Sequence, residues 1–161
     1  MSALRAVVVT ISDSAHAGTR HDLSGPAVAA RLEDDGVSVV ERLVIPDERQ
    51  VIAATLREVS ARLVAGVVFT TGGTGVTPRD ITPEATRDVI EKEIPGFGEL
   101  MRSKGLASTP NAALSRAVSG IRAGVLIVNL PGSTRGAVES LEAVLKLVPH
   151  VLDLINGRTG H

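Results

Sequence analysis

The residues whose types and spacing could support chemistry gather first in one segment, residues 70–80. It holds three glycines within four positions, threonines on either side of them, and an arginine followed by an acid at its end. Because glycine has no Cβ, the backbone N–H groups of such a segment can converge on an anion, and threonine hydroxyls add further donors. The segment therefore predicts a phosphate-binding loop, whose candidate ligands are Thr71, Gly72, Gly73, Thr74, Gly75 and Arg79.

The acid that ends this segment is Asp80. A carboxylate beside a bound phosphate costs free energy unless a cation lies between the two negative charges. We therefore expect Asp80 to ligate Mg²⁺. The segment matches neither common nucleotide motif, because no lysine precedes Lys92 and because Pro78 stands where the dinucleotide pattern needs glycine. A glycine-rich turn that only reverses the chain is the alternative interpretation.

A second candidate acid, Asp47, lies between a strand-like run at 37–45 and apolar residues at helical spacing over 51–63. Gln50 follows it three residues later, which is the pattern of a helix N-cap with a capping-box partner. From this local pattern alone, helix capping is the favoured interpretation of Asp47. A catalytic and metal-binding role is the alternative.

Polar residues also follow two other apolar runs. Ser12 and Asp13 come after the run at 5–11, where they either bind a ligand or cap a turn, and Asp13 could supply a third acid. The run at 124–130 leads into a turn before a helix, and helix N-termini bind anions. We expect this turn to line the same ligand crevice through Asn129, Pro131, Gly132 and Ser133.

The elements that must position these residues follow from hydrophobic patterning. Strands are predicted at 5–11, 37–45, 64–69, 117–121 and 124–130, and helices at 26–35, 51–63, 82–90, 98–102, 137–148 and 149–155. Thr82 is the expected N-cap of the helix at 82–90. Residues 15–25 are expected to form an exposed loop, which is a candidate cover for a ligand. Uncharged, β-branched strands alternating with helices indicate an α/β fold with a mostly parallel sheet. The turns that carry Asp13, Asp47 and Asp80 would then converge at the carboxyl edge of the sheet.

Composition narrows the functional classes. The chain has 161 residues, enough for one domain over 1–161, and a formal charge of −1, which argues against a large nucleic-acid footprint. It has no cysteine, which excludes thiolate catalysis and thiolate metal sites, and no tryptophan or tyrosine on which bases could stack. It shows no secretory signal pattern and no membrane-length apolar segment, so we expect a cytoplasmic protein with no membrane partner.

Motifs along nearly the whole chain are similar to those of the MogA/MoaB family of molybdenum-cofactor biosynthesis, which includes the gephyrin G domain. The resemblance rests on segments in matching order: 11–13, 44–48, 71–80, 82–86, 95–99, 114–116 and 129–133. It implies a single-domain, three-layer α/β/α sandwich, commonly trimeric, that binds molybdopterin. Gly105 stands where many members carry serine.

The resemblance also implies an activity. Active members use ATP and Mg²⁺ to adenylylate molybdopterin, giving adenylyl-molybdopterin and pyrophosphate, and the product can pass to a molybdate-insertion protein. The acids matching Asp47 and Asp80 are the functional ones, so the resemblance makes both catalytic residues and metal ligands, against the capping interpretation of Asp47. A non-catalytic, MoaB-type molybdopterin-binding protein is the alternative function, and a scaffold role like that of gephyrin is a weaker one.

Overall fold

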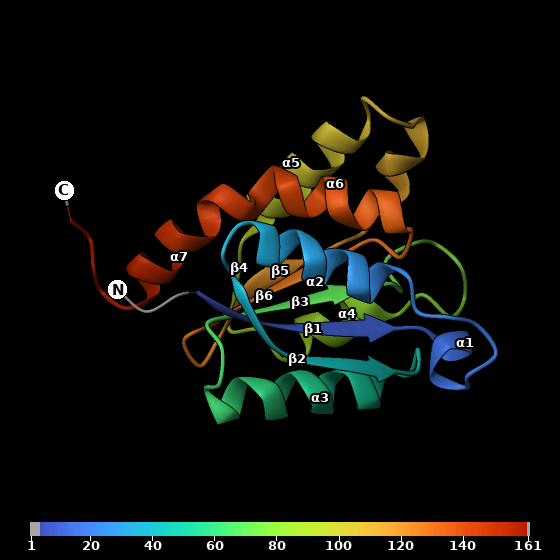
Figure 1. Ribbon diagram of the computed structural model, residues 1–161, viewed down its shortest axis with the longest axis horizontal. Helices are drawn as coiled ribbons and strands as arrows, with labels where there is room; N and C mark the ends of the chain where they lie inside the picture. Colours follow the sequence, from blue (N-terminus) through green and yellow to red (C-terminus); the bar gives the residue numbers. More distant parts are fainter. Residues whose placement is uncertain (1–3, 161) are drawn as a thin grey trace.

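Six strands form one sheet in this computed structural model, which describes residues 4–160. The strand order is β2-β1-β3-β6-β5-β4 (Figure 1). The strands are β1 (Arg5–Ile11), β2 (Ser38–Ile45), β3 (Val67–Thr71), β4 (Lys92–Glu93), β5 (Ser119–Arg122) and β6 (Val125–Leu130). The four strands β2, β1, β3 and β6 pair in parallel with one another in that order. Strand β5 pairs antiparallel with β6, and β4 pairs antiparallel with β5, so the predicted mostly parallel sheet is confirmed.

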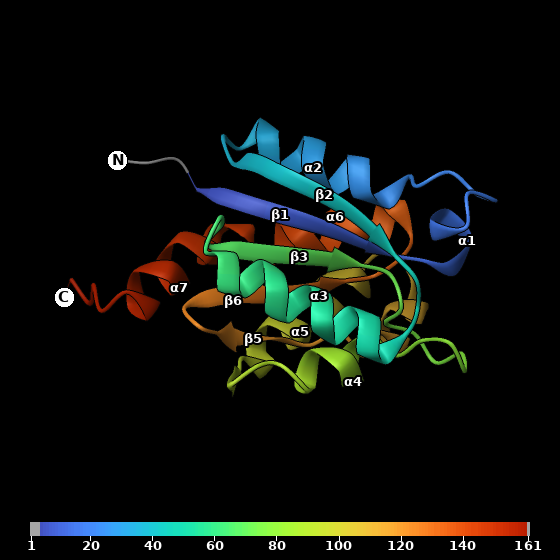
Figure 2. The same ribbon diagram turned by 90° about the horizontal axis from the view of Figure 1, so that it is seen from below.

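Helices cover both faces of this sheet and complete the expected three-layer sandwich (Figures 1 and 2). On one face lie α2 (Ser24–Asp34), α5 (Pro95–Gly105), α6 (Thr134–Val144) and α7 (Val148–Ile155). On the other lie α3 (Arg49–Arg62) and α4 (Thr82–Arg87). Short helical turns α1 (Asp13–His16), η1 (Pro110–Leu114) and η2 (Leu145–Leu147) complete the chain. No helix in the described part is both long and apolar enough to cross a membrane.

Strand β1 shows why the sequence forms this sandwich. Its side chains alternate between two hydrophobic cores: Ala6 and Val8 pack under α2 and α6, while Val7, Val9 and Ile11 pack under α3. From Ala6 onward every residue of β1 is buried. A strand covered on both faces needs apolar residues at every position, which is the uncharged, β-branched run that the sequence contains.

The strand register brings the functional turns to one edge of the sheet. The last residues of β1 and β2, Ile11 and Ile45, are partners, and Thr10 of β1 pairs with Thr71 at the end of β3. Thr71 in turn pairs with Leu130, the last residue of β6. Four parallel strands therefore end at the same level, and the turns after them share one space, as predicted.

Two regions differ from the sequence-based expectation. The helix predicted over 82–90 ends at Arg87, and the short strand β4 follows before α5 begins at Pro95. The helix predicted over 137–148 instead starts at Thr134 and ends at Val144, and the next helix, α7, contains Pro149 in its first turn. Proline has no N–H to donate and suits the first turn of a helix, so Pro95 begins α5 where only an interruption was expected, whereas the separate helix expected from Pro149 is present as α7.

Candidate functional site

Two adjoining cavities open at the carboxyl edge of the sheet. The first, here called the strand-end cavity, has a volume of about 530 Å³ and is bordered by residues 10–12, 20–24, Asp47 and the start of the glycine loop. The second, the helix cavity, has a volume of about 360 Å³ and is bordered mainly by α5, η1 and α6. Four residues line both cavities: Gly73, Asp80, Gly132 and Ser133. The glycine loop and the turn after β6 therefore form the boundary between them.

The glycine loop adopts a backbone that only glycine tolerates well. Gly72 and Gly73 have φ of +108° and +71°, and a Cβ on Gly72 would stand 2.2 Å from the carbonyl oxygen of Ile11. The N–H groups of residues 73–76 have no hydrogen-bond partner within residues 4–160. Unpaired N–H groups along such a turn can bind an anion, and phosphate binding by this loop stays a prediction.

Asp47 does not cap helix α3. That helix begins at Arg49 after an N-cap at Glu48, and no side chain caps it. Instead, Asp47 Oδ2 accepts a hydrogen bond of 2.9 Å from the Asp13 main-chain N–H. The capping interpretation was therefore wrong, because the partner of this carboxylate comes from the turn after β1 rather than from its own helix.

The environment of Asp47 disfavours its charge. Burial raises the pKa of the Asp47 carboxyl, and the negative charges of Asp13 and Asp80 raise it further, against the hydrogen bond from Asp13, which lowers it. Asp47 Oδ1 receives no hydrogen bond within the described residues, and it would stand 3.0 Å from a Cβ on Gly73. One carboxylate oxygen is thus left free at the wall of the strand-end cavity.

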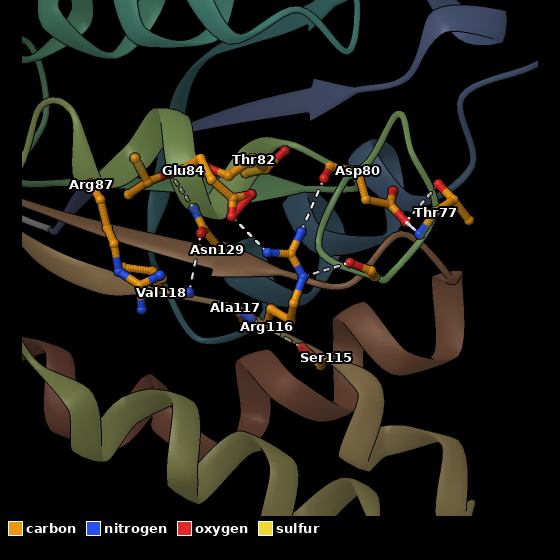
Figure 3. Close-up of polar contacts among 12 residues, drawn as sticks. Thr77, Asp80, Thr82, Glu84, Arg87, Ser115, Arg116, Ala117, Val118 and Asn129 are labelled. Carbon is orange, nitrogen blue, oxygen red and sulfur yellow. Dashed lines mark hydrogen bonds and ion pairs between the residues drawn. The ribbon is translucent and has the colours of Figure 1, made fainter.

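Asp80 is held in a similar way by a different turn. Its Oδ2 accepts hydrogen bonds from the Thr77 N–H at 3.0 Å and from the Thr77 hydroxyl at 2.9 Å (Figure 3). No residue in the range 4–160 donates to Oδ1 of Asp80, and Asp80 lines both cavities. Asp47 and Asp80 therefore each offer a free carboxylate oxygen to the strand-end cavity.

Such oxygens suit Mg²⁺, which takes hard oxygen ligands from one or two carboxylates and completes its shell with water and phosphate. Within residues 4–160 there is no group of three or more His, Cys, Asp or Glu side chains arranged to hold a metal ion. The two carboxylates could therefore supply only part of a Mg²⁺ coordination shell, and phosphate and water oxygens would have to supply the rest.

Asp13 is engaged by Arg79 rather than open to the cavities. Arg79 donates from Nε to Asp13 Oδ2 at 2.9 Å and from Nη2 to Oδ1 at 3.0 Å. The Arg79 hydrogen bonds lower the pKa of the Asp13 carboxyl, and Asp13 Oδ1 also accepts from the Asp47 N–H. Both of its oxygens are occupied, so Asp13 does not act as a third open acid in this structure. Its neighbour Ser12 caps α1 by accepting from Ala15 N–H.

Two predicted ligands have side chains that bond within the protein. Asn129 is fully buried; it accepts from Val118 N–H at 3.1 Å and donates to the hydroxyls of Thr70 and Thr86. The expected place of the Asn129 side chain in the crevice is therefore corrected: it lies beneath the site and fastens β6 to its neighbours (Figure 3). The Thr71 hydroxyl is likewise buried and donates to the Pro131 carbonyl at 2.7 Å.

Helix α4 also departs from its predicted start. Thr82 is its first residue rather than its N-cap, and the N-cap is Ile81 without a side-chain hydrogen bond. The Thr82 hydroxyl donates to the Gly72 carbonyl at 3.0 Å and the Thr82 N–H donates to the Gly73 carbonyl at 3.1 Å. Thr82 therefore holds the glycine loop. At the start of α6, by contrast, Ser133 is the N-cap and accepts from Gly136 N–H.

Several residues of the site were not predicted from sequence. Arg20, His21 and Asp22 lie on the wall of the strand-end cavity and belong to the segment that was expected to form an exposed loop over a ligand, but none of the three was singled out from sequence. The helix cavity draws on the α5–η1 segment, where a Cβ on Gly105 would come within 2.8 Å of Ala112 Cβ. Arg116 holds the glycine loop from outside both cavities. The motif at 114–116 was the only sequence signal that could have pointed to Arg116.

Comparisons with known proteins agree with this geometry. The profile of the family described as "Probable molybdopterin binding domain" matches residues 7–150. The molybdopterin adenylyltransferase of Helicobacter pylori strain J99 is 43% identical over 159 residues, which cover 98% of this chain and 90% of that protein. The Escherichia coli K12 protein of the same name is 43% identical over 146 residues, with 89% and 75% coverage.

Solved structures give the same result. A crystal structure of the molybdopterin biosynthesis enzyme MoaB from Thermus thermophilus is 46% identical, with a TM-score of 0.89 over 96% of this chain and 97% of that chain. The molybdopterin biosynthesis Mog protein from Mycobacterium ulcerans is 36% identical, also with a TM-score of 0.89, over 98% and 99%. The predicted resemblance and fold are both confirmed.

Proposed function

The chain belongs to the family of probable molybdopterin binding domains, and on that premise we propose that it transfers AMP from ATP to molybdopterin. The observation that carries the proposal is that Asp47 and Asp80, each with one free carboxylate oxygen, line one cavity together with Gly73, the first of the loop residues whose N–H groups are unpaired. A protein that only bound an anionic pterin would gain nothing from two carboxylates near its ligand. A metal-assisted phosphate reaction requires them.

We assign the strand-end cavity to ATP and the helix cavity to molybdopterin. The strand-end cavity contains Ser12, Asp47 and the N-terminus of α6, a polar lining that matches a triphosphate. The helix cavity has Met101, Ala112 and Ala117 on its wall, which match a flat heterocycle. The two reacting phosphates would then meet at the shared boundary, between the glycine loop and the turn formed by Pro131, Gly132 and Ser133.

The reaction needs little beyond positioning and charge neutralisation. An oxygen of the molybdopterin phosphate attacks the α-phosphorus of ATP; the new P–O bond forms as the bond to the β-phosphate oxygen breaks, and pyrophosphate leaves. The attacking phosphate monoester is already anionic at pH 7, so no general base is needed. Mg²⁺, held by Asp47 and Asp80, would supply positive charge against the triphosphate and the leaving pyrophosphate.

Residues of the chain would bind and orient the reacting phosphates. The N–H groups of Gly73, Thr74 and Gly75 would bind phosphate oxygens at the cavity boundary and hold them in line. Arg79 would contribute by neutralising Asp13, so that only Asp47 and Asp80 face the phosphates as free acids.

A turnover assay distinguishes the two candidate functions. Purified protein is incubated with molybdopterin, ATP and MgCl₂, and pyrophosphate is measured with and without a chelator. Pyrophosphate release that needs both molybdopterin and the metal supports the adenylyltransferase. Tight molybdopterin binding without ATP consumption would instead establish the non-catalytic binding protein.

Three further aspects of the proposal concern the cellular setting. We expect a homotrimer in the cytoplasm that hands adenylyl-molybdopterin to a molybdate-inserting protein. A mass from light scattering tests the oligomeric state directly. A monomeric mass at assay concentration would contradict the trimer and leave the active-site assignment unchanged, because both cavities lie within one chain.

A further inference from the structure

Arg116 makes an unusual set of contacts with the glycine loop. Its main-chain N–H donates to the Thr74 carbonyl at 2.8 Å, its Nε to the Gly75 carbonyl at 2.8 Å, and its Nη2 to the Asp80 carbonyl at 3.0 Å (Figure 3). Its Nη1 forms an ion pair of 2.6 Å with Glu84 in α4. Arg116 thus binds both ends of the segment that carries the catalytic acid, although it lines neither the strand-end cavity nor the helix cavity.

These contacts determine which way the loop amides point. In a trans peptide, the C=O and the following N–H point in opposite directions. Because the carbonyls of Thr74 and Gly75 point at Arg116, the N–H groups of Gly75 and Val76 point away from it. Both of these N–H groups lack a hydrogen-bond partner within residues 4–160. The main-chain bond of Arg116 therefore orients the Gly75 N–H, which belongs to a residue on the wall of the helix cavity, and its Nε bond orients the Val76 N–H.

The same contacts restrain Asp80. Its carboxylate is fixed only by the local turn with Thr77, which is itself exposed. Its main chain is tied to Arg116, and through Arg116 to helix α4, which packs in the core. Without that side-chain tie, the described anchors of the segment carrying Asp80 would be Thr82, the end of β3 and the main-chain hydrogen bond from residue 116 to Thr74.

The guanidinium is suited to this task and an ammonium is not. Three nitrogens of one planar group reach three acceptors on different segments, a fork that lysine cannot reproduce. The Glu84 ion pair raises the pKa of Arg116, and Arg116 in turn lowers the pKa of Glu84. Glu84 Oε1 is buried with no hydrogen-bond partner in the described chain, so Arg116 is the group that compensates this carboxylate.

We propose that Arg116 is a positioning residue for adenylyl transfer, which holds Asp80 at the boundary of the two cavities and fixes the adjoining glycine loop at Gly75 without touching substrate. This inference rests on the proposed function. Loss of Arg116 should therefore lower the turnover number, because a displacement of about 1 Å in a positioned group can reduce turnover by about 10²-fold.

The first test is Arg116→Ala, with Arg116→Lys beside it. We expect kcat to fall by about 10²-fold in both, with kcat/KM falling in parallel, as happens when an interaction needed in the transition state is lost. Hydrogen exchange should become faster in the peptide covering 74–82, because the side-chain hydrogen bonds from Arg116 to the Gly75 and Asp80 carbonyls are lost. Wild-type kcat in Arg116→Ala would overturn the inference.

Chemical rescue gives a readout that a purely structural role would not produce. Arg116 borders a separate open cavity of about 330 Å³ and its side chain is 38% exposed, so a small cation can enter the space left by Arg116→Ala. Methylguanidinium should raise kcat of that variant several-fold, whereas methylammonium should not, because only the former has the planar fork. Equal rescue by both cations would show that charge alone matters and would contradict positioning.

Two controls separate this role from folding and from the proposed function. Arg87→Ala removes another arginine that borders the same outer cavity, pairs with Glu93 and touches no part of the loop; its kcat should equal that of the wild type. If Arg116→Ala unfolds, the double variant Glu84→Gln/Arg116→Ala removes the unpaired charge, and its kcat should still be low; wild-type kcat in it would overturn the inference. No pyrophosphate from the wild type would refute the proposed function itself.

Discussion

Asp13 and Asp47 hold each other by a reciprocal pair of hydrogen bonds, in which the main-chain N–H of each donates to the carboxylate of the other at 2.9 Å. The pair joins the turns that follow two adjacent parallel strands, β1 and β2. The two acids differ in whether a carboxylate oxygen is left without a hydrogen bond. Asp13 is neutralised by Arg79, whereas Asp47 keeps one oxygen free at the cavity wall.

The first prediction concerns catalysis by Asp80. The Asp80→Asn variant keeps the Thr77 hydrogen bonds through its amide oxygen but loses the charge that would hold Mg²⁺. We expect pyrophosphate release to fall by at least about 10²-fold with the circular dichroism spectrum unchanged. Asp153→Asn, at a half-exposed position on α7, makes the same chemical change outside the site and should not alter the rate. Normal turnover in Asp80→Asn would remove Asp80 from the mechanism.

The second prediction concerns the pH dependence of stability through Asp47. Its pKa in the folded protein is raised above the ordinary value of 3.8, mainly by burial, so its ionised form is less favourable folded than unfolded. Stability must therefore fall as the pH rises from 3.8 through the raised pKa, and the penalty is complete once the pH exceeds that pKa. Asp47→Asn, which has no charge, should then have a higher Tm than the wild type at pH 7 without metal.

Differential scanning fluorimetry across pH 4–7 checks this expectation. The Tm advantage of Asp47→Asn should shrink toward pH 4, where wild-type Asp47 takes up its proton. Added MgCl₂ with ATP should raise the Tm of the wild type more than that of the variant, since bound ligand stabilises the folded state. Asp34→Asn makes the same substitution at an exposed position on α2; it is the control and should leave the Tm at pH 7 close to that of the wild type. A constant Tm difference at every pH would contradict the titration of Asp47.

The third prediction concerns the close approach of Gly72 to β1. Alanine there needs φ of +108° and places its Cβ 2.2 Å from the Ile11 carbonyl oxygen, which is main chain and cannot move aside cheaply. Gly36→Ala is the matched control, because Gly36 also has positive φ, +82°, but has nothing within 4 Å of the added Cβ. In urea unfolding, we expect Gly72→Ala to cost about 1–3 kcal/mol more than Gly36→Ala. Equal losses would mean that the backbone angle alone matters.

The fourth prediction tests the structural placement of Asn129. Asn129→Ala removes the acceptor of the buried Val118 N–H and the partner of two threonine hydroxyls. The orphaned N–H alone should lower the free energy of unfolding by about 1–3 kcal/mol. Asn156→Ala deletes an exposed amide whose one bond is to the Leu152 carbonyl, and it should have little effect. Unfolding by urea measures both, and an unchanged midpoint for Asn129→Ala would contradict the placement.

The part of the fold set by local pattern was predictable from sequence. The buried runs of β1, β3 and β6 have apolar side chains on both faces, and that pattern is readable within seven residues. The two-residue strand β4 is too short to show a period, and its pairing with β5 depends on residues about 30 positions away. That is why a helix was predicted to continue toward this region, and why the strand was missed.

The residue types of the candidate site were readable from the sequence, but the contacts that each residue makes were not. The glycines and acids of the loop predict phosphate and metal binding, because few other functions need these residue types together. Which oxygen of Asp47 is free, however, depends on Asp13, 34 residues earlier. The contribution of Arg116 depends on acceptors 32–41 residues before it. The local sequence around each of these residues is the same whether or not the fold brings it to its distant hydrogen-bond partner, so the sequence pattern does not reveal the contact.

By itself, then, the order of residues determined the family, the alternation of strands and helices, and the set of polar groups at the carboxyl edge of the sheet. Only the tertiary structure decided which of those side chains have all their oxygens hydrogen-bonded within the protein, as Asp13 and Asn129 do, and which keep one oxygen free, as Asp47 and Asp80 do. The physical reason is that each hydrogen-bonding group has few bonds to make. Whether one is left for a ligand depends on neighbours that the fold, and not the local sequence, supplies.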